Sequence, residues 1–144
     1  MPTNKILSVA AYPPPTRWHP YPDVHWDESY FREVAKRCDQ LAVMAYDAGQ
    51  RIPKTYQRLM ADWAREILAW SEWKEVLIGV PAYDDTGVGY HNPRVENLTN
   101  ALLGIHRALS SAPLIQNFRG LAIYCEWEMD TNEWQHWREH FLKP

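Results

Sequence analysis

Four short apolar segments recur along the chain, separated by longer polar stretches. They are KILSVAAY at 5–12, LAVMAYD at 41–47, EVLIGVPAYD at 75–84 and GLAIYCEW at 120–127. Their starts lie roughly 35 to 45 residues apart. The apolar side chains are continuous instead of alternating, which is typical of strands buried on both faces of a parallel sheet. The pattern therefore predicts four parallel strands.

Apolar residues with helical spacing lie between and after these segments. The clearest set spans 56–68, where Tyr56, Leu59, Trp63 and Ile67 fall on one helix face. The resulting order of elements is β-α-β-α-β-α-β-α, which requires right-handed crossovers. We therefore predict the α/β class, with four successive βα units in one domain over residues 1–144.

Polar residues with capping chemistry precede the predicted helices. Asn92 is the predicted N-cap of a helix that carries Val95 to Leu109, with Pro93 at its first position. Asp27 precedes an earlier helix, and either Asp130 or Thr131 precedes the last one. For Asp130 we favour this capping role over a role in a site.

Composition narrows the classes of partner. The 144 residues include 15 Lys plus Arg against 18 Asp plus Glu, a net charge of −3. Without a basic stripe to neutralise phosphates, we expect no nucleic-acid partner. The apolar runs are strand-sized, and the start of the chain does not resemble a signal peptide, so we expect a soluble, cytoplasmic protein that neither spans nor binds a membrane.

Other candidate chemistry is weaker. His136 and His140 are spaced as a metal pair on the last predicted helix, but no third ligand is evident, and we favour a solvated helix face. Cys38 and Cys125 should lie at opposite ends of the sheet, too far apart for a disulfide. The glycines of YDDTGVGYHNP lack the spacing of a nucleotide-binding loop. We therefore expect no metal and no cofactor.

Aromatic and acidic residues follow the predicted strands. Parallel βα units place their chemistry at the carboxyl ends of the strands, where the loops converge. Aromatic rings with carboxylate acceptors suit a carbohydrate, because a sugar's C–H face packs on a ring while its hydroxyls need directional partners. The alternative is that the rings only cover the core and the acids only cap helices. The candidate site residues here are Tyr46, Asp47, Tyr83, Asp84, Tyr124, Glu126 and Trp127.

The four strand segments resemble parts of glycoside hydrolase family 18, the chitinase-like (β/α)8 barrels. LAVMAYDAG resembles the M-x-Y-D motif of that family's sixth strand, and IGVPAY is similar to G-[VI]-P-x-Y of its seventh. KILSVAAYPPP and FRGLAIYCEWEMD are similar to its fifth and eighth strands. The resemblance implies the carboxyl-terminal half of a barrel. It also implies that Tyr46 and Asp47 bind the acetamido group and sugar at the cleavage point of an N-acetylated oligosaccharide, with Met44 packed beneath.

The chain departs from the family in two places. Its catalytic signature, D-x-x-D-x-D-x-E on the fourth strand, is absent from the sequence, and the family's Glu in that motif is the general acid. The family's eighth-strand Trp corresponds to Tyr124, and Trp127 lies three positions further on. The catalytic residues are therefore unknown, and whether the chain is an enzyme stays open.

A half TIM barrel leaves two sheet edges and an interior face without partners. We expect closure by a homodimer, with a complementary half-barrel chain or a partly open four-stranded sheet as the alternatives. Three functions remain: a glycosidase fragment that is inactive alone, a non-catalytic sugar-binding module, and a purely structural homodimeric protein. A new acid pair formed by rim carboxylates such as Asp47, Asp84, Glu126 and Glu128 is a variant of the first.

Overall fold

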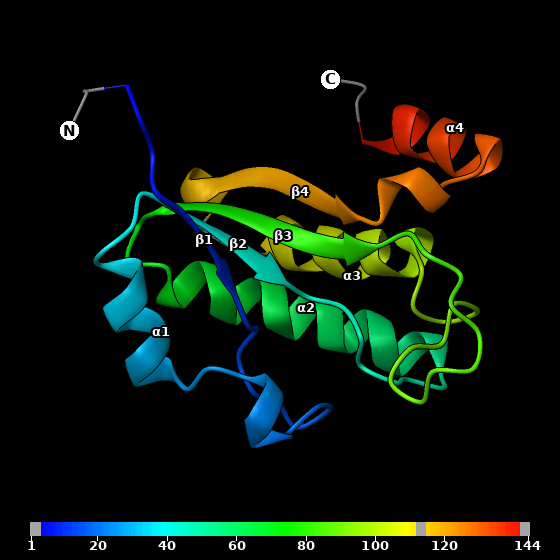
Figure 1. Cartoon of the computed structure of the whole chain (residues 1–144), viewed down its shortest axis with the longest axis horizontal. Helices are drawn as coiled ribbons and strands as arrows, with labels where there is room; N and C mark the ends of the chain where they lie inside the picture. The colour runs from blue at the N-terminus through cyan, green and yellow to red at the C-terminus, as the bar shows by residue number, and fades with distance from the viewer. Residues whose placement is uncertain (1–3, 112–114, 142–144) are drawn as a thin grey trace.

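The computed structural model describes residues 4–111 and 115–141 and has four parallel strands that alternate with four α-helices (Figure 1). This arrangement confirms the predicted α/β class and is consistent with a half barrel. The elements in chain order are β1 (Ser8–Ala11), α1 (Glu28–Ala35), β2 (Gln40–Met44), α2 (Pro53–Trp70), β3 (Glu75–Pro81), α3 (Leu98–Ser111), β4 (Phe118–Tyr124) and α4 (Thr131–His140). Short 3₁₀ turns lie at Pro22–Val24, Ile115–Asn117 and Glu126–Glu128.

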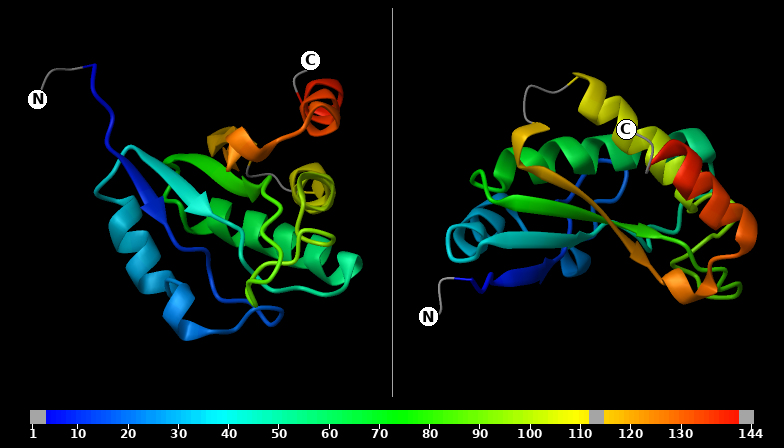
Figure 2. Two further views of the ribbon diagram at one scale, coloured as in Figure 1. Left: turned by 45° about the vertical axis from the view of Figure 1, so that its right-hand side comes forward. Right: turned by 90° about the horizontal axis from the view of Figure 1, so that it is seen from above.

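The sheet has the order β1-β2-β3-β4, so that each strand pairs with its neighbour in sequence. Helices α1, α2 and α3 lie on one side of it, and α4 lies beyond the carboxyl end of β4 (Figure 2). Leu41 and Val43 of β2 and Val76 and Ile78 of β3 are fully buried on the helical side. The core is thus the layer between the sheet and the helices.

Helix α2 is the central element of this core. Its apolar face contains the predicted 56–68 set, and Tyr56, Leu59, Trp63 and Ile67 have no exposed surface. Helix α3 packs against it closely at Gly104, where an added Cβ would overlap the carbonyl oxygen of Gln57. The periodic sequence therefore forms a helix buried on one side by the sheet and by α3.

Two predicted caps are confirmed. The Asp27 carboxylate accepts a hydrogen bond from the backbone N–H of Tyr30 at 2.9 Å. Asp130, not Thr131, caps α4, and it forms a capping box with Glu133. The structural interpretation of Asp130 is therefore correct.

The predicted start of α3 is wrong. Residues 93–97 form turns, the helix begins at Leu98, and the Asn97 side chain accepts from the N–H of Asn100 at 3.1 Å. The carbonyl of Asn92 accepts from the N–H groups of Val95 and Glu96, which makes a single turn, while the Glu96 carboxylate accepts from backbone N–H groups of two loops. Asn92 and Pro93 consequently lie in a loop.

The face of the sheet opposite the helices is not covered by any described element (Figure 2). Because paired residues point to the same side, one row across this face is formed by Ala10, Ala42, Leu77 and Gly120. Their side chains are small or partly exposed. At the amino ends of the strands a polar ladder crosses the same face, as Ser8 donates to Gln40, and Gln40 and Arg119 both donate to Glu75. The open face is therefore apolar in its middle and polar at one end.

Candidate functional site

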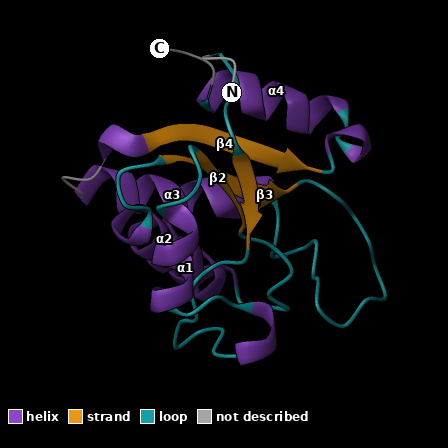
Figure 3. Cartoon of the chain, turned by 60° about the vertical axis from the view of Figure 1, so that its left-hand side comes forward, coloured by secondary structure: helices purple, strands orange, loops and turns teal. Residues whose placement is uncertain are grey.

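A cavity of about 460 Å³ opens at the carboxyl ends of β1, β2 and β4. Figure 3 shows the loops that leave the sheet at this end. We call this cavity the rim cavity. It contains four of the predicted site residues, Met44, Tyr46, Asp47 and Tyr124. Its other lining residues are Tyr12, Pro13, His19, Val24, His25, Trp63 and Tyr90. Met44, Tyr46 and Asp47 come from β2 and the loop after it, and Tyr124 is at the end of β4, so residues from two strand ends meet at this rim.

Two tyrosine rings form one wall of the rim cavity. The rings of Tyr46 and Tyr124 stack with centroids 4.7 Å apart and planes 6° apart. The Tyr46 ring lies over Gly79 of β3, where an added Cβ would be 3.1 Å from its Cε1 atom. Burial raises the pKa of Tyr46 to about 12, and Tyr124 and Asp47 add to the shift. Both phenols are therefore neutral donors and acceptors at neutral pH.

Asp47 lies at the floor of the cavity in an uncommon backbone conformation. Strand β2 ends at Met44, so the predicted strand was too long, and Asp47 has a φ of 62° in the loop. Burial raises the pKa of its carboxyl, with the Asp85 charge acting in the same direction and His91 opposing both. Its Oδ1 atom is buried without a hydrogen-bond partner.

Two buried residues that the sequence did not single out hold this loop. The Glu96 side chain has no exposed surface and accepts hydrogen bonds from the N–H of Ala48 at 2.7 Å and of Asn92 at 2.8 Å. The His91 ring is equally buried, and its Nδ1 is 3.7 Å from Asp47 Oδ1 and 3.5 Å from Glu96 Oε2. These contacts tie the loop after β2 to the loop after β3.

The opposite wall comes from the loop between β1 and α1. His19 and His25 contact each other through ring nitrogens 2.9 Å apart, and His25 also contacts the carbonyl of Tyr21. Burial beside His25 lowers the pKa of His19 to about 4, and burial lowers that of His25. Trp63 of α2 lies against both rings and donates its indole N–H to the Pro14 carbonyl at 2.8 Å. The loop is therefore anchored on the core.

The remaining predicted residues lie around the cavity instead of lining it. Tyr83 is buried, with its ring edge against Tyr124 at 5.5 Å. Asp84 donates its backbone N–H to Glu128 at 3.2 Å and faces a different groove, between α3 and α4. Glu126 and Trp127 belong to a 3₁₀ turn after β4, and the Trp127 side chain is 71% exposed. Trp127 is not among the described residues that line the rim cavity, and its ring meets that of Tyr124 in a T-shaped arrangement with centroids 6.4 Å apart.

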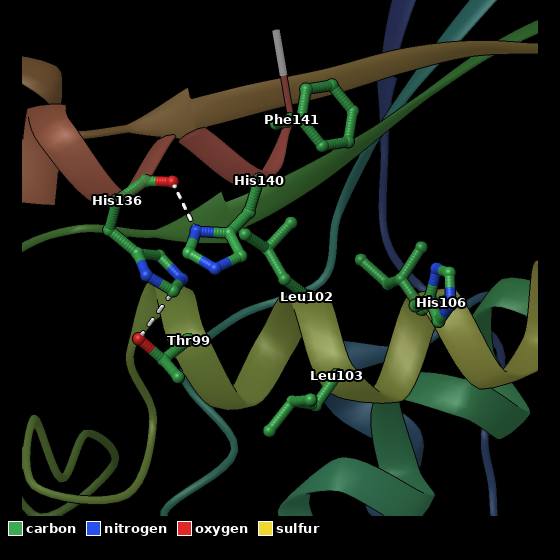
Figure 4. Close-up of a pocket in the computed structure, with 8 residues that line it drawn as sticks. Thr99, Leu102, Leu103, His106, His136, His140 and Phe141 are labelled. Carbon is green, nitrogen blue, oxygen red and sulfur yellow. Dashed lines mark hydrogen bonds between the residues drawn. The ribbon is translucent and has the colours of Figure 1, made fainter. Parts of the chain in front are cut away.

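The two histidines of α4 face another groove between α3 and α4, separate from the one that Asp84 faces, with a volume of about 460 Å³ (Figure 4). Their rings stack at 4.2 Å, His140 Nδ1 contacts the carbonyl of His136, and His136 contacts Thr99 at 3.4 Å. Leu102, Leu103 and Phe141 form the apolar part of the groove. Among the described residues, no three His, Cys, Asp or Glu side chains are grouped to hold a metal ion. Both cysteines are free thiols.

Comparisons with family models, with curated proteins and with solved structures find no match for this chain. No helix in the described part of the chain combines the length and apolarity needed to cross a bilayer. The site must therefore be interpreted from its own geometry.

Proposed function

We propose that this chitinase-like half barrel binds an N-acetylated oligosaccharide in the rim cavity and does not hydrolyse it alone. The supporting observation is that Tyr46, Tyr124 and Asp47 line one cavity. A stacked aromatic wall beside a carboxylate supplies both an apolar surface for a sugar ring and an acceptor for its hydroxyl or amide groups. The chain has no D-x-x-D-x-D-x-E motif and therefore lacks the general acid that hydrolysis of this kind requires.

The arrangement also favours binding over catalysis for a geometric reason. Asp84 and Glu128 are neighbours outside the cavity, which leaves Asp47 as the single carboxylate that lines it in the described structure. A glycosidase that does not use its substrate's acetamido group as the nucleophile needs two carboxyl groups about 5 to 9 Å apart on either side of the bond, and the substrate-assisted kind still needs a general acid. One lining carboxylate positions a ligand but does not form that pair.

Titration calorimetry with a chitin hexasaccharide tests the proposal. The Tyr124→Ala variant removes an aromatic wall that is 44% exposed, and we expect about a tenfold loss of affinity, equivalent to about 1.4 kcal/mol. Cello-oligosaccharide, which lacks the acetamido group, should bind more weakly to the unaltered protein. Trp73→Asn, at an exposed site with φ of 64° near the other end of the sheet, should bind like the unaltered protein. Absence of any heat with the chitin hexasaccharide would overturn the proposal.

We further propose that a second copy of the chain covers the open face of the sheet. Strands β1 and β4 are both edges, so each carries backbone groups that another parallel strand can pair with. Three of the four residues in the row between them, Ala10, Ala42 and Gly120, are small and allow a close approach. Light scattering at micromolar concentration should return twice the chain mass, and Ala42→Arg should return the chain mass with an unchanged circular dichroism spectrum. A monomeric unaltered protein would leave a complementary half-barrel chain as the partner.

A further inference from the structure

A closed group of polar side chains lies directly beneath Asp47. The His91 and Glu96 side chains have no exposed surface, and Asp47 Oδ1 and His91 Nδ1 are buried without hydrogen-bond partners. Buried polar atoms in native proteins are nearly always paired, so an arrangement of this kind requires an explanation. The position of the hydrogens on His91 supplies one.

One imidazole nitrogen has a fixed role. His91 Nε2 lies 3.0 Å from the carbonyl oxygen of Tyr83, and a carbonyl only accepts, so Nε2 carries a hydrogen. In a neutral ring Nδ1 would then present a lone pair to Asp47 Oδ1 at 3.7 Å and Glu96 Oε2 at 3.5 Å. Three facing lone pairs repel one another in a buried site. A proton among these atoms turns the repulsion into attraction.

The surroundings decide which groups hold that proton. Both Glu96 oxygens already accept backbone N–H groups, an environment that suits its carboxylate form. The other titratable groups beside the cluster are acids: the Asp85 charge acts on Asp47, the buried Tyr56 hydroxyl interacts with Glu96 and Asp47, and the Tyr83 ring stacks on His91 with centroids 4.0 Å apart. Within the described chain no Lys or Arg forms an ion pair with Asp47 or Glu96. The imidazole is therefore the cation that can neutralise this acidic group.

We infer that His91 Nδ1 carries a proton, so that the imidazolium forms an ion pair with both Asp47 Oδ1 and the Glu96 carboxylate, and that His91 is the positioning residue for Asp47 in the rim cavity. This ion pair holds the Asp47 loop in its left-handed conformation and leaves Oδ2 as the oxygen available to a ligand. Loss of the proton leaves two carboxylates beside a neutral ring, and their repulsion moves Asp47 away from its binding position. Burial raises the pKa of both Asp47 and Glu96, which agrees with a cluster that retains a proton.

The first test needs no ligand and no variant. Imidazole ¹⁵N spectra at about pH 7 should show both His91 nitrogens protonated, with the exposed His106 as the internal reference. A neutral His91 with one bare nitrogen at that pH would overturn the inference. Because this measurement involves only the free protein, it stands or fails separately from the sugar-binding proposal.

The second test rests on the proposed function. Affinity for the chitin hexasaccharide should fall about tenfold per pH unit above the titration of the cluster, the slope for loss of one proton. His91→Gln places a non-titrating amide at the same site, so its affinity should be independent of pH over that range. A His91→Gln variant with an unchanged pH profile would refute the positioning role. If neither the unaltered protein nor the His91→Gln variant binds the hexasaccharide, the sugar-binding proposal is wrong. The ¹⁵N spectra still show whether His91 is protonated.

Discussion

The Gly79→Ala substitution connects the packing of the sheet to the geometry of the rim cavity. A Cβ at Gly79 would lie 2.8 Å from the carbonyl oxygen of Val43 and 3.1 Å from Cε1 of Tyr46. The first neighbour is backbone in the adjacent strand, and the second is the ring that stacks on Tyr124. Neither can move without disturbing β2 or the aromatic wall.

The magnitude follows from this overlap. Forcing one extra methyl group into a packed core typically costs about 1 to 3 kcal/mol, and the glycine-to-alanine gain in the unfolded chain offsets about 0.5 to 1 kcal/mol. We therefore expect the free energy of unfolding to fall by about 1 to 2 kcal/mol. For a chain of this size that change lowers the melting temperature by about 3 to 8 °C.

Urea denaturation and thermal melting measure the loss, and near-ultraviolet circular dichroism reports the displacement of the tyrosine rings. Gly89→Ala is the matched control, because an added Cβ there has no neighbour within 4 Å and its φ is not in the left-handed region. Its stability should change by less than about 0.5 kcal/mol. A Gly79→Ala variant as stable as the Gly89→Ala variant, with an unaltered aromatic signal, would refute the contact between Gly79 and the Tyr46 ring.

Two further predictions concern the loop histidines and the helix pair. The pKa of His19 is lowered to about 4, so the folded state loses stability as the pH falls from about 6.5 toward about 4, by roughly 3 kcal/mol at most. His19→Gln should remove much of this pH dependence of the free energy of unfolding, measured by urea denaturation at about pH 7 and about pH 4.5. If the unaltered protein and the variant lose the same stability between these two pH values, the prediction is wrong. Gly104→Ala should lose about 2 kcal/mol despite a better helix propensity, because the new Cβ overlaps Gln57 and Met60 of α2. If the Gly104→Ala variant has the same unfolding midpoint as Gly89→Ala, the prediction is wrong, because α2 and α3 can then move apart to accept the methyl group without a loss of stability.

The parts of the fold that follow from local chemistry were predictable from the sequence. Continuous apolar runs indicated the four strands. Asp27 and Asp130 indicated helix starts, because a capping side chain and the backbone N–H that it accepts from lie three residues apart in the sequence. The common rim of Tyr46, Asp47 and Tyr124 followed from the rule that parallel strands end at one edge. The predicted start of α3 was wrong, because Glu96 is engaged by a residue 48 positions away, a contact that local spacing does not reveal.

His91 and Glu96 were not predicted as site residues for the same reason, because their contacts join residues that are distant in the sequence. His91 and Glu96 lie in a stretch of turn residues, and their functional partners, Asp47 and Ala48, are far away in sequence. A buried glutamate has no signature of its own, because a solvated one in a helix has the same spacing. The outward position of Trp127 was equally unpredictable, since the strand was expected to extend through it and instead ends at Tyr124.

The three loops around the cavity are joined through Gln50, which explains how long irregular segments form a defined site. Its carbonyl accepts from the Asn92 side chain at 3.0 Å, and its side-chain amide donates to the Trp18 carbonyl at 3.0 Å. Gly49, next to it, donates to the Tyr90 carbonyl at 2.8 Å. The loops after β1, β2 and β3 therefore share hydrogen bonds, and the entropy of ordering them is lost on folding, before any ligand arrives. The proposed ligand would therefore require little further ordering of the cavity, because the aromatic wall and the carboxylate are already in place.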